Sequence, residues 1–135
     1  MYSIEDKVFF EKNGYLKLDN FLTNSHLGYY DKIYNDFINS KYNTNGLRSD
    51  LSGEKDGKKE LITQIMLPSK ILPQLINKPI HTFGLKTAQF LLGDDIVLDF
   101  DMLINKAPNT NKETPWHQDA AYWIDMPDER ALSIW

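Results

Sequence analysis

A histidine and an aspartate separated by one residue, His117 and Asp119, are the side chains of this sequence best suited to chemistry. On an extended strand, residues i and i+2 project from the same face, so an imidazole and a carboxylate at this spacing can bind one metal ion together. With a second histidine from elsewhere, they would complete the two-histidine, one-carboxylate ligand set of non-heme Fe(II) oxygenases. An isolated pair of this kind is more often an ordinary hydrogen-bonded pair at the surface or in the core.

The elements that must position this pair are predicted from the pattern of apolar residues. Residues 115–123 indicate a strand that carries both side chains, and a longer strand with period-two alternation is predicted over residues 95–105. The polar segment 39–60 is expected to be a long loop. The remaining elements are expected to be helices over residues 4–13, 25–39, 69–77 and 79–92 and strands over residues 15–19, 61–67 and 131–135.

The ends of several predicted helices carry capping residues. Ser3 can accept a hydrogen bond from the first turn of the first helix, and Thr23 or Asn24 can do so for the second. Gly14 and Gly93 stand where a glycine commonly follows a helix end. These signals fix the helix boundaries more closely than the apolar pattern alone does.

Composition limits the class of protein. The chain has 135 residues, of which 41% are hydrophobic and 25% charged, a balance typical of one globular domain or part of one. It has no cysteine, which excludes disulfides, zinc–thiolate sites and a thiol nucleophile. A net charge of −4 without a long basic run argues against a nucleic-acid partner. No apolar run approaches the about 20 residues that span a bilayer, and no signal peptide is evident, so a cytoplasmic protein without a membrane partner is expected.

Five blocks of the sequence, in order, resemble the phytanoyl-CoA dioxygenase family. The segment Thr114–Trp123 is similar to the iron-binding motif of that family, with a tryptophan before the His-x-Asp pair and an aromatic pair after it. The other similar blocks are residues 10–22, 91–96, 102–108 and 130–135. The pair alone would be a weak signal, and the ordered blocks around it give the resemblance its specificity.

The resemblance implies a fold and an activity. The implied fold class is α+β, with a double-stranded β-helix (jelly roll) on whose sheet the N-terminal helices pack; residues 1–135 would form the N-terminal part of a single such domain. The implied activity is hydroxylation of a small-molecule substrate by molecular oxygen, with Fe(II) as the cofactor and 2-oxoglutarate as the cosubstrate. His117 and Asp119 would be the first two iron ligands, and the carboxylate at 119 favours hydroxylation over halogenation.

Two further residues are candidates through the resemblance. Trp123 stands where family members often place an aromatic side chain near the substrate, although core packing explains it equally well. Lys106 could approach the cosubstrate, although a position in a turn explains it better. No further catalytic residue is predicted. Asp99 and Asp101 form a second acid pair, with no histidine nearby in sequence, and are expected to be solvated or to support the site from outside.

The ligand set implied by the resemblance is incomplete in this sequence. The family's second histidine ligand and its 2-oxoglutarate-binding arginine follow the motif, whereas His26 and His81 precede it and are expected to be ordinary histidines. Since the sequence finishes on the apolar, strand-like segment 131–135, we expect a piece of a longer protein with an incomplete jelly roll. A short protein whose last strand is a paired edge is the alternative.

Three functions therefore stay open. The first is an oxygenase of this family, and the alternative is a non-catalytic binding or interaction module that keeps the scaffold with an incomplete metal site. A cupin-like metal protein is the third, although it would require a histidine cluster that this sequence does not show. The substrate and the oligomeric state are not encoded in any motif that we find.

Overall fold

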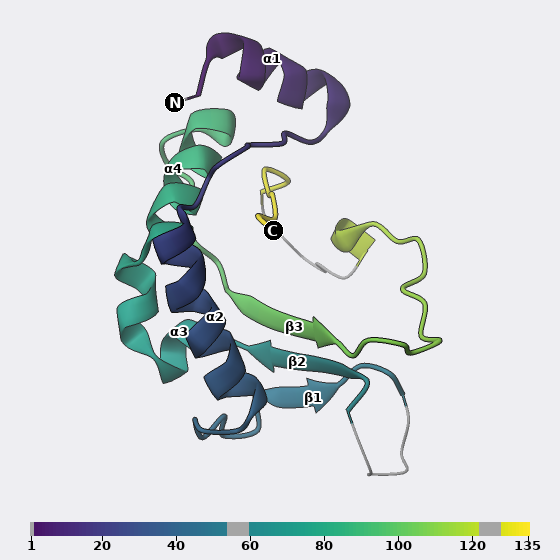
Figure 1. Ribbon diagram of the computed structural model, residues 1–135. Helices are drawn as coiled ribbons and strands as arrows, with labels where there is room; N and C mark the ends of the chain where they lie inside the picture. The colour runs from purple at the N-terminus through teal and green to yellow at the C-terminus, as the bar shows by residue number, and fades with distance from the viewer. Residues whose placement is uncertain (1, 54–59, 122–127) are drawn as a thin grey trace.

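Residues 2–53, 60–121 and 128–135 are described by a computed structural model of the chain, in which the longer helices lie on one side of a small antiparallel sheet (Figure 1). The α-helices are α1 (Ile4–Asn13), α2 (Asn24–Ile38), α3 (Pro68–Ile71) and α4 (Pro79–Leu92). Two short 3-10 helices are η1 (Pro73–Asn77) and η2 (Asp119–Ala121). The strands are β1 (Arg48–Asp50), β2 (Ile62–Met66) and β3 (Met102–Lys106).

The sheet has the order β1-β2-β3, with both pairs of neighbours antiparallel. In the register, Ile65 of β2 lies opposite Arg48 of β1 on one side and opposite Leu103 of β3 on the other. The predicted mixture of helix and sheet is confirmed. The described residues form a three-stranded sheet, so the jelly roll stays a prediction.

The core lies between α2 and the sheet. Phe37 of α2 and Ile65 of β2 are both 0% exposed, and Ile33 and Leu75 complete the buried cluster. A hydroxyl group ties the helix to the far strand, because Tyr34 donates a hydrogen bond to Oδ1 of Asn105 at 2.6 Å. The sequence therefore places its best-buried apolar groups where the amphipathic face of α2 meets the central strand.

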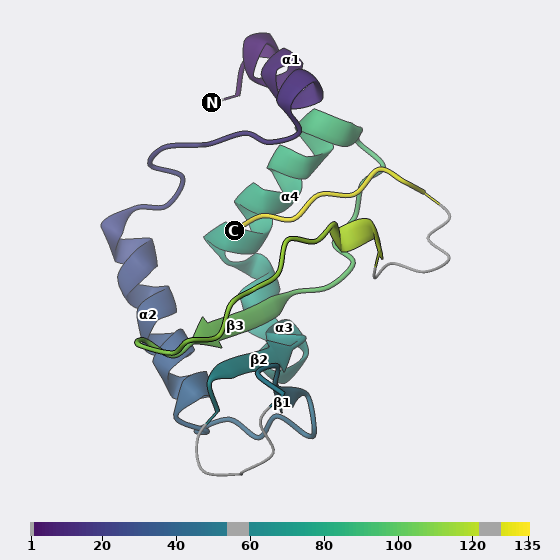
Figure 2. The ribbon, with the colours of Figure 1, turned by 90° about the vertical axis from the view of Figure 1, so that its right-hand side faces the viewer.

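Helix α4 is joined to the N-terminus of the chain. The ring of Tyr2 stacks on Phe90 with centroids 5.4 Å apart, and the Tyr2 hydroxyl accepts a hydrogen bond from Thr87 at 2.6 Å. Helix α1 accordingly lies against α4 rather than on the sheet (Figures 1 and 2). Of the predicted N-terminal helices, only α2 packs on the sheet. Within the described residues, no helix is both long and apolar enough to cross a membrane.

The helix predictions are largely confirmed. Helices α1, α2 and α4 agree with the predicted ranges within one residue, and Ser3 and Thr23 accept the expected capping hydrogen bonds from the third residue of each helix. Gly14 adopts the left-handed conformation, with φ 76°, that ends α1. The predicted helix over residues 69–77 is instead divided into α3 and η1, because Leu72 precedes Pro73 and is driven out of the helical region, with φ −127° and ψ 78°.

The prediction of an unstructured loop over residues 39–60 is wrong at Arg48–Asp50, which form β1. The side chain of Arg48 contacts the carboxylate of Glu60 at 2.8 Å and donates to the carbonyl oxygen of Phe37 at 3.1 Å, at the end of α2. Oδ1 of Asp50 accepts from the backbone N–H of Ile62 at 3.0 Å. Polar side chains therefore build this strand, and an apolar pattern could not reveal it.

Four strand predictions extend beyond what the structure forms. Residues 15–19, 95–101, 115–121 and 131–135 are not strands, and the predicted strand over 95–105 is reduced to β3. Strand β2 offers five residues for pairing, and β3 uses all of them. Strand β2 ends at Met66, because Leu67 adopts the left-handed conformation with φ 53° and α3 follows. Asp101 bonds this junction: its carbonyl oxygen accepts from the backbone N–H of Leu67 and its carboxylate from that of Ser69. Residues 122 and 123 of the predicted metal-binding strand lie outside the described residues.

We predict that Phe37→Ala lowers the free energy of unfolding by about 3–5 kcal/mol, because it leaves a cavity at a fully buried position. Leu27→Ala in the same helix is the matched control, since Leu27 is 51% exposed and should cost far less. Urea unfolding followed by circular dichroism measures both. Equal losses for the two variants would show that the core does not lie between α2 and the sheet.

We also predict that Asp50→Asn loses stability in a pH-dependent way. Hydrogen bonds from the backbone N–H groups of Ser52 and Ile62 lower the pKa of Asp50 from 3.8 to about 2. A lowered folded-state pKa stabilises the fold fully above the unfolded value, and this contribution is lost as the pH falls through about 2. The difference between wild type and Asp50→Asn in urea unfolding should therefore be largest near neutral pH and shrink from about pH 4 downward.

The control for this experiment is Asp19→Asn, which removes the same charge from an exposed pair with Lys17. Its effect on unfolding should be small at every pH, because exposed ion pairs contribute little. The free energies of unfolding of wild type and Asp50→Asn are compared at each pH. A difference between them that stays constant from neutral pH to pH 2 would contradict the role given to the Asp50 carboxylate.

Candidate metal site

The predicted metal-binding segment follows β3. After Lys106 the chain turns, with Asn109 in the left-handed conformation at φ 58°, and leads to η2, which begins at Asp119. Both ribbon views place η2 beyond β3, on the side away from β1 and β2 (Figures 1 and 2). His117 lies just before η2 and Asp119 is the first residue of η2, so the strand that the sequence predicts does not set their distance.

The structure brings the two predicted ligands together. Nε2 of His117 lies 3.3 Å from Oδ1 of Asp119, and the two side chains are 40% and 46% exposed. On its other side, the imidazole ring places Nδ1 2.7 Å from the carbonyl oxygen of Pro115. The ring is therefore held between a carbonyl and a carboxylate. Its role as an iron ligand stays a prediction.

The contact with Pro115 fixes the tautomer of His117. A carbonyl oxygen can only accept, so Nδ1 carries the proton and donates it at 2.7 Å. In the neutral ring, Nε2 then holds a lone pair and faces a carboxylate oxygen 3.3 Å away. Two electron-rich atoms at this distance are stabilised by a positive charge, either a proton on Nε2 or a metal ion bound by both.

The pair fits a divalent metal ion in its chemistry and its spacing. Ligand atoms about 2.1 Å from one ion lie about 3 Å apart on neighbouring octahedral positions, close to the observed 3.3 Å. Imidazole and carboxylate are the ligand types of non-heme Fe(II) sites. Among residues 2–53, 60–121 and 128–135, no group of three or more ligating side chains gathers. The described site thus offers two ligands.

Ser133 is a third member of the site, and the sequence did not single it out. Its hydroxyl lies 3.5 Å from Oδ2 of Asp119, the carboxylate oxygen that does not face His117. The available signal was one hydroxyl side chain within the otherwise apolar segment 131–135. That signal does not indicate which residue Ser133 contacts, because its partner, Asp119, lies fourteen positions away in the sequence.

The other predicted site residues are not placed at the pair. Lys106 is the last residue of β3, where it lies opposite Ile62, and it is exposed. Trp123 lies outside the described residues. The roles of Lys106 toward the cosubstrate and of Trp123 toward the substrate stay predictions.

The two remaining histidines have other partners. Nδ1 of His26 accepts from the backbone N–H of Thr23 at 3.4 Å, in the capping box of α2. Nε2 of His81 in α4 lies 3.0 Å from Oδ2 of Asp101, and both side chains are largely buried. The expectation that Asp101 is solvated or supports the metal site is thereby corrected, because its carboxylate is largely buried and pairs with His81, twenty residues away in sequence.

Asp101 joins three elements. Burial raises the pKa of its carboxyl, but the hydrogen bonds from His81 and Ser69 outweigh burial and hold the pKa below its usual value. Ser69 donates both its hydroxyl, at 2.8 Å, and its backbone N–H, at 3.1 Å. The carboxylate therefore ties the entry to β3 to the start of α3 and to α4, which is a structural role.

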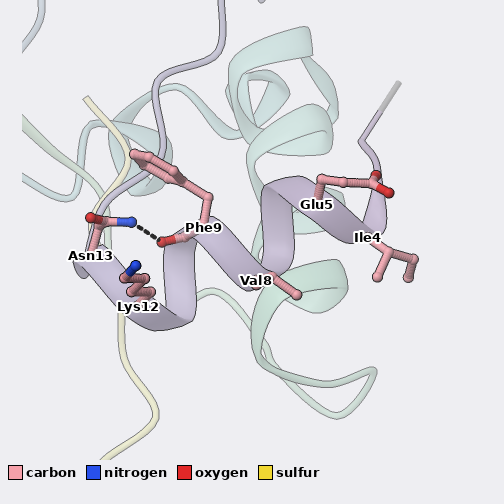
Figure 3. A pocket seen from close by; sticks show the side chains of 6 residues that line it. All are labelled: Ile4, Glu5, Val8, Phe9, Lys12 and Asn13. Carbon is pink, nitrogen blue, oxygen red and sulfur yellow. Dashed lines mark hydrogen bonds between the residues drawn. The ribbon is translucent and has the colours of Figure 1, made fainter.

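A shallow hollow also lies along one face of α1 (Figure 3). The residues that line it are Ile4, Glu5, Val8, Phe9, Lys12 and Asn13. Ile4 and Val8 are 68% and 56% exposed, so the hollow is largely apolar. Because none of these residues is a predicted ligand, the hollow is separate in its residues and its chemistry from the His117–Asp119 pair.

Comparison with known families identifies the class of protein. The family model for phytanoyl-CoA dioxygenase (PhyH) matches residues 10–135, from within α1 to the last residue. The chain therefore belongs to the phytanoyl-CoA dioxygenase family, and the predicted resemblance is confirmed. No curated protein and no solved structure matches the chain.

We predict that the neutral form of His117 carries its proton on Nδ1, opposite to the other two histidines. His26 accepts at Nδ1, and His81 directs Nε2 at a carboxylate, so both should carry the proton on Nε2. Long-range proton–nitrogen NMR spectra of the imidazole rings, recorded above pH 8, distinguish the two tautomers. Three identical patterns would show that the Pro115 contact does not hold His117.

Proposed function

We propose that this chain carries the metal-binding motif of an Fe(II)- and 2-oxoglutarate-dependent hydroxylase that acts on a small organic molecule with molecular oxygen. The observation that carries this proposal is the convergence of Nε2 of His117 and Oδ1 of Asp119 at 3.3 Å. Family membership supports it, because members of the phytanoyl-CoA dioxygenase family are typically dependent on iron and 2-oxoglutarate.

Each residue of the pair contributes a distinct property. Pro115 holds the imidazole so that Nε2 keeps its lone pair for the ion, and Asp119 contributes a negative charge that offsets part of the ion's charge. The half-exposed position of both side chains leaves the site open to a cosubstrate. Bound iron would supply the activation of oxygen, coupled to decarboxylation of 2-oxoglutarate.

We further propose that residues 1–135 are the N-terminal part of a single jelly-roll domain, in which a second histidine and an arginine that follow Trp135 complete the site. The distribution of apolar surface supports this. Val97, which precedes β3 in the sequence, is 78% exposed, and Trp116 and Trp135 are 104% and 92% exposed. Large apolar side chains as open to water as these are a surface that further structure could cover.

A second candidate function is favoured by the ligand count. The part of the chain that the structure describes offers two ligands, and two ligands make a weak site. A non-catalytic binding or interaction module with an incomplete metal site would have such a set of two ligands. The two candidates differ in whether 2-oxoglutarate is consumed.

The proposal is tested first by metal binding. NMR titration of the chain with Co²⁺, a stable stand-in for Fe(II), should shift or broaden the resonances of residues 115–119. His117→Ala and Asp119→Ala should each weaken Co²⁺ binding by more than about tenfold, since even supporting contacts at metal sites contribute 10–100-fold. His26→Ala is the matched control and should bind as wild type does, because His26 belongs to the capping box of α2.

Activity then separates the two candidates. The full-length protein that contains this chain, supplied with Fe(II), 2-oxoglutarate and oxygen, should form succinate, and His117→Ala should abolish that formation. Equal succinate formation by wild type and His117→Ala would overturn the proposed hydroxylase function. Co²⁺ binding at the pair without any consumption of 2-oxoglutarate would favour the binding module.

A further inference from the structure

We propose that Ser133 is a positioning residue for the metal site, which holds one oxygen of Asp119 so that the other stays directed at His117. The inference rests on the proposed function of the His117–Asp119 pair. It adds a third side chain with a defined task.

The two oxygens of Asp119 have different neighbours. Oδ1 lies 3.3 Å from Nε2 of His117, and Oδ2 lies 3.5 Å from the hydroxyl oxygen of Ser133. The terminal torsion of an aspartate is broad, so a free carboxylate would turn and offer either oxygen, or both, to an ion. A hydroxyl that donates to Oδ2 limits this rotation and leaves Oδ1 for the ion. Such contacts are often long in the unloaded site and shorten when the site is filled.

Serine suits this task by its chemistry. A carboxylate can only accept, so the Ser133 hydroxyl must donate. The donor is neutral, and it therefore leaves the negative charge of Asp119 available to the metal ion. A lysine or arginine at this position would instead compete with the ion for that charge.

An ion-pair anchor on one side of Ser133 fixes the backbone. The guanidinium of Arg130 contacts both oxygens of Asp95, at 3.0 Å from Nη1 and 2.7 Å from Nη2. Nη1 also donates to the carbonyl oxygen of Leu92, at the end of α4, at 3.3 Å. Paired contacts of this kind fix the orientation of a guanidinium as well as its position. The segment is thereby held at the C-terminal end of α4.

A close contact on the other side of Ser133 completes the placement. A Cβ atom built on Gly84 of α4 would lie 3.3 Å from Cδ1 of Ile134, so the missing side chain leaves the space in which Ile134 sits. The segment runs alongside α4 (Figure 2). Ile134 contacts the helix and its neighbour Ser133 contacts Asp119, so the two side chains project to different sides. Helix α4 thus determines where the hydroxyl points.

The test is the Co²⁺ affinity of the whole 135-residue chain, measured by NMR titration. Ser133→Ala should weaken Co²⁺ binding about tenfold, the lower end of what supporting contacts contribute. Ser133→Thr keeps the hydroxyl and should restore binding to within about threefold of wild type. Ser49→Ala removes an exposed serine hydroxyl from β1 and is the matched control.

A second variant tests the anchor without touching the site. Arg130→Met removes the contacts with Asp95 and Leu92, so it should weaken Co²⁺ binding in the same direction as Ser133→Ala. Combined with Ser133→Ala, it should weaken binding little further, because both changes act through one contact. Circular dichroism of each variant confirms that the helices are retained.

The possible results separate the two proposals. If Ser133→Ala binds Co²⁺ as wild type does while Asp119→Ala does not bind, the positioning role is overturned and the metal site stands. If Asp119→Ala and wild type do not differ, the proposed function fails and the positioning role fails with it. Weakened binding in Ser133→Ala that Ser133→Thr does not restore also overturns the role of the hydroxyl.

Discussion

The hydrogen bond from Nδ1 of His117 to the carbonyl oxygen of Pro115, at 2.7 Å, is the constraint on which the candidate site depends. It joins residues two positions apart, so no tertiary contact is needed to set the tautomer. Its consequence is a lone pair on Nε2 that faces Asp119. The local arrangement of Pro115–Asp119 therefore favours the binding of a cation. The rest of the fold determines the environment of this segment.

Helix α4 is the element to which segments from both halves of the chain are attached. Successive turns of the helix take partners from the N-terminus, α2, the entry to β3 and the last segment. These contacts are Ile80 with Tyr30, His81 with Asp101, Gly84 with Ile134, Thr87 with Tyr2, and Leu92 with Arg130. A change in α4 would therefore reach the site through Ser133, although no ligand lies on that helix.

The sequence predicted those features whose causes are local. Helix α2 follows from its apolar stripe and from the cap at Thr23. The His117–Asp119 pair was expected from its spacing on a strand, whereas the two side chains meet just before and at the start of η2. Strand β1 could not be predicted, because Arg48 and Asp50 find their partners more than ten residues away, at Glu60 and Ile62. The prediction of a strand over residues 95–101 was wrong for a different reason. Alternating apolar residues indicate which face of a strand would be buried, but they do not provide a neighbouring strand for pairing.

The same reasoning connects the exposed apolar surface to the chemistry. An oxygen-activating site works best when water is excluded, because a dry site strengthens its electrostatic contacts and suppresses side reactions. His117 and Asp119 are 40% and 46% exposed, and Trp116, between Pro115 and His117, is 104% exposed. Further structure that buried Trp116 would remove a large apolar side chain from water. The same structure would also exclude water from the neighbouring imidazole of His117. The stability of the fold and the reactivity of the site would then both depend on the layer that covers Trp116. A fold that left this face open to water could still bind a metal ion, but it would be less suited to oxygen chemistry.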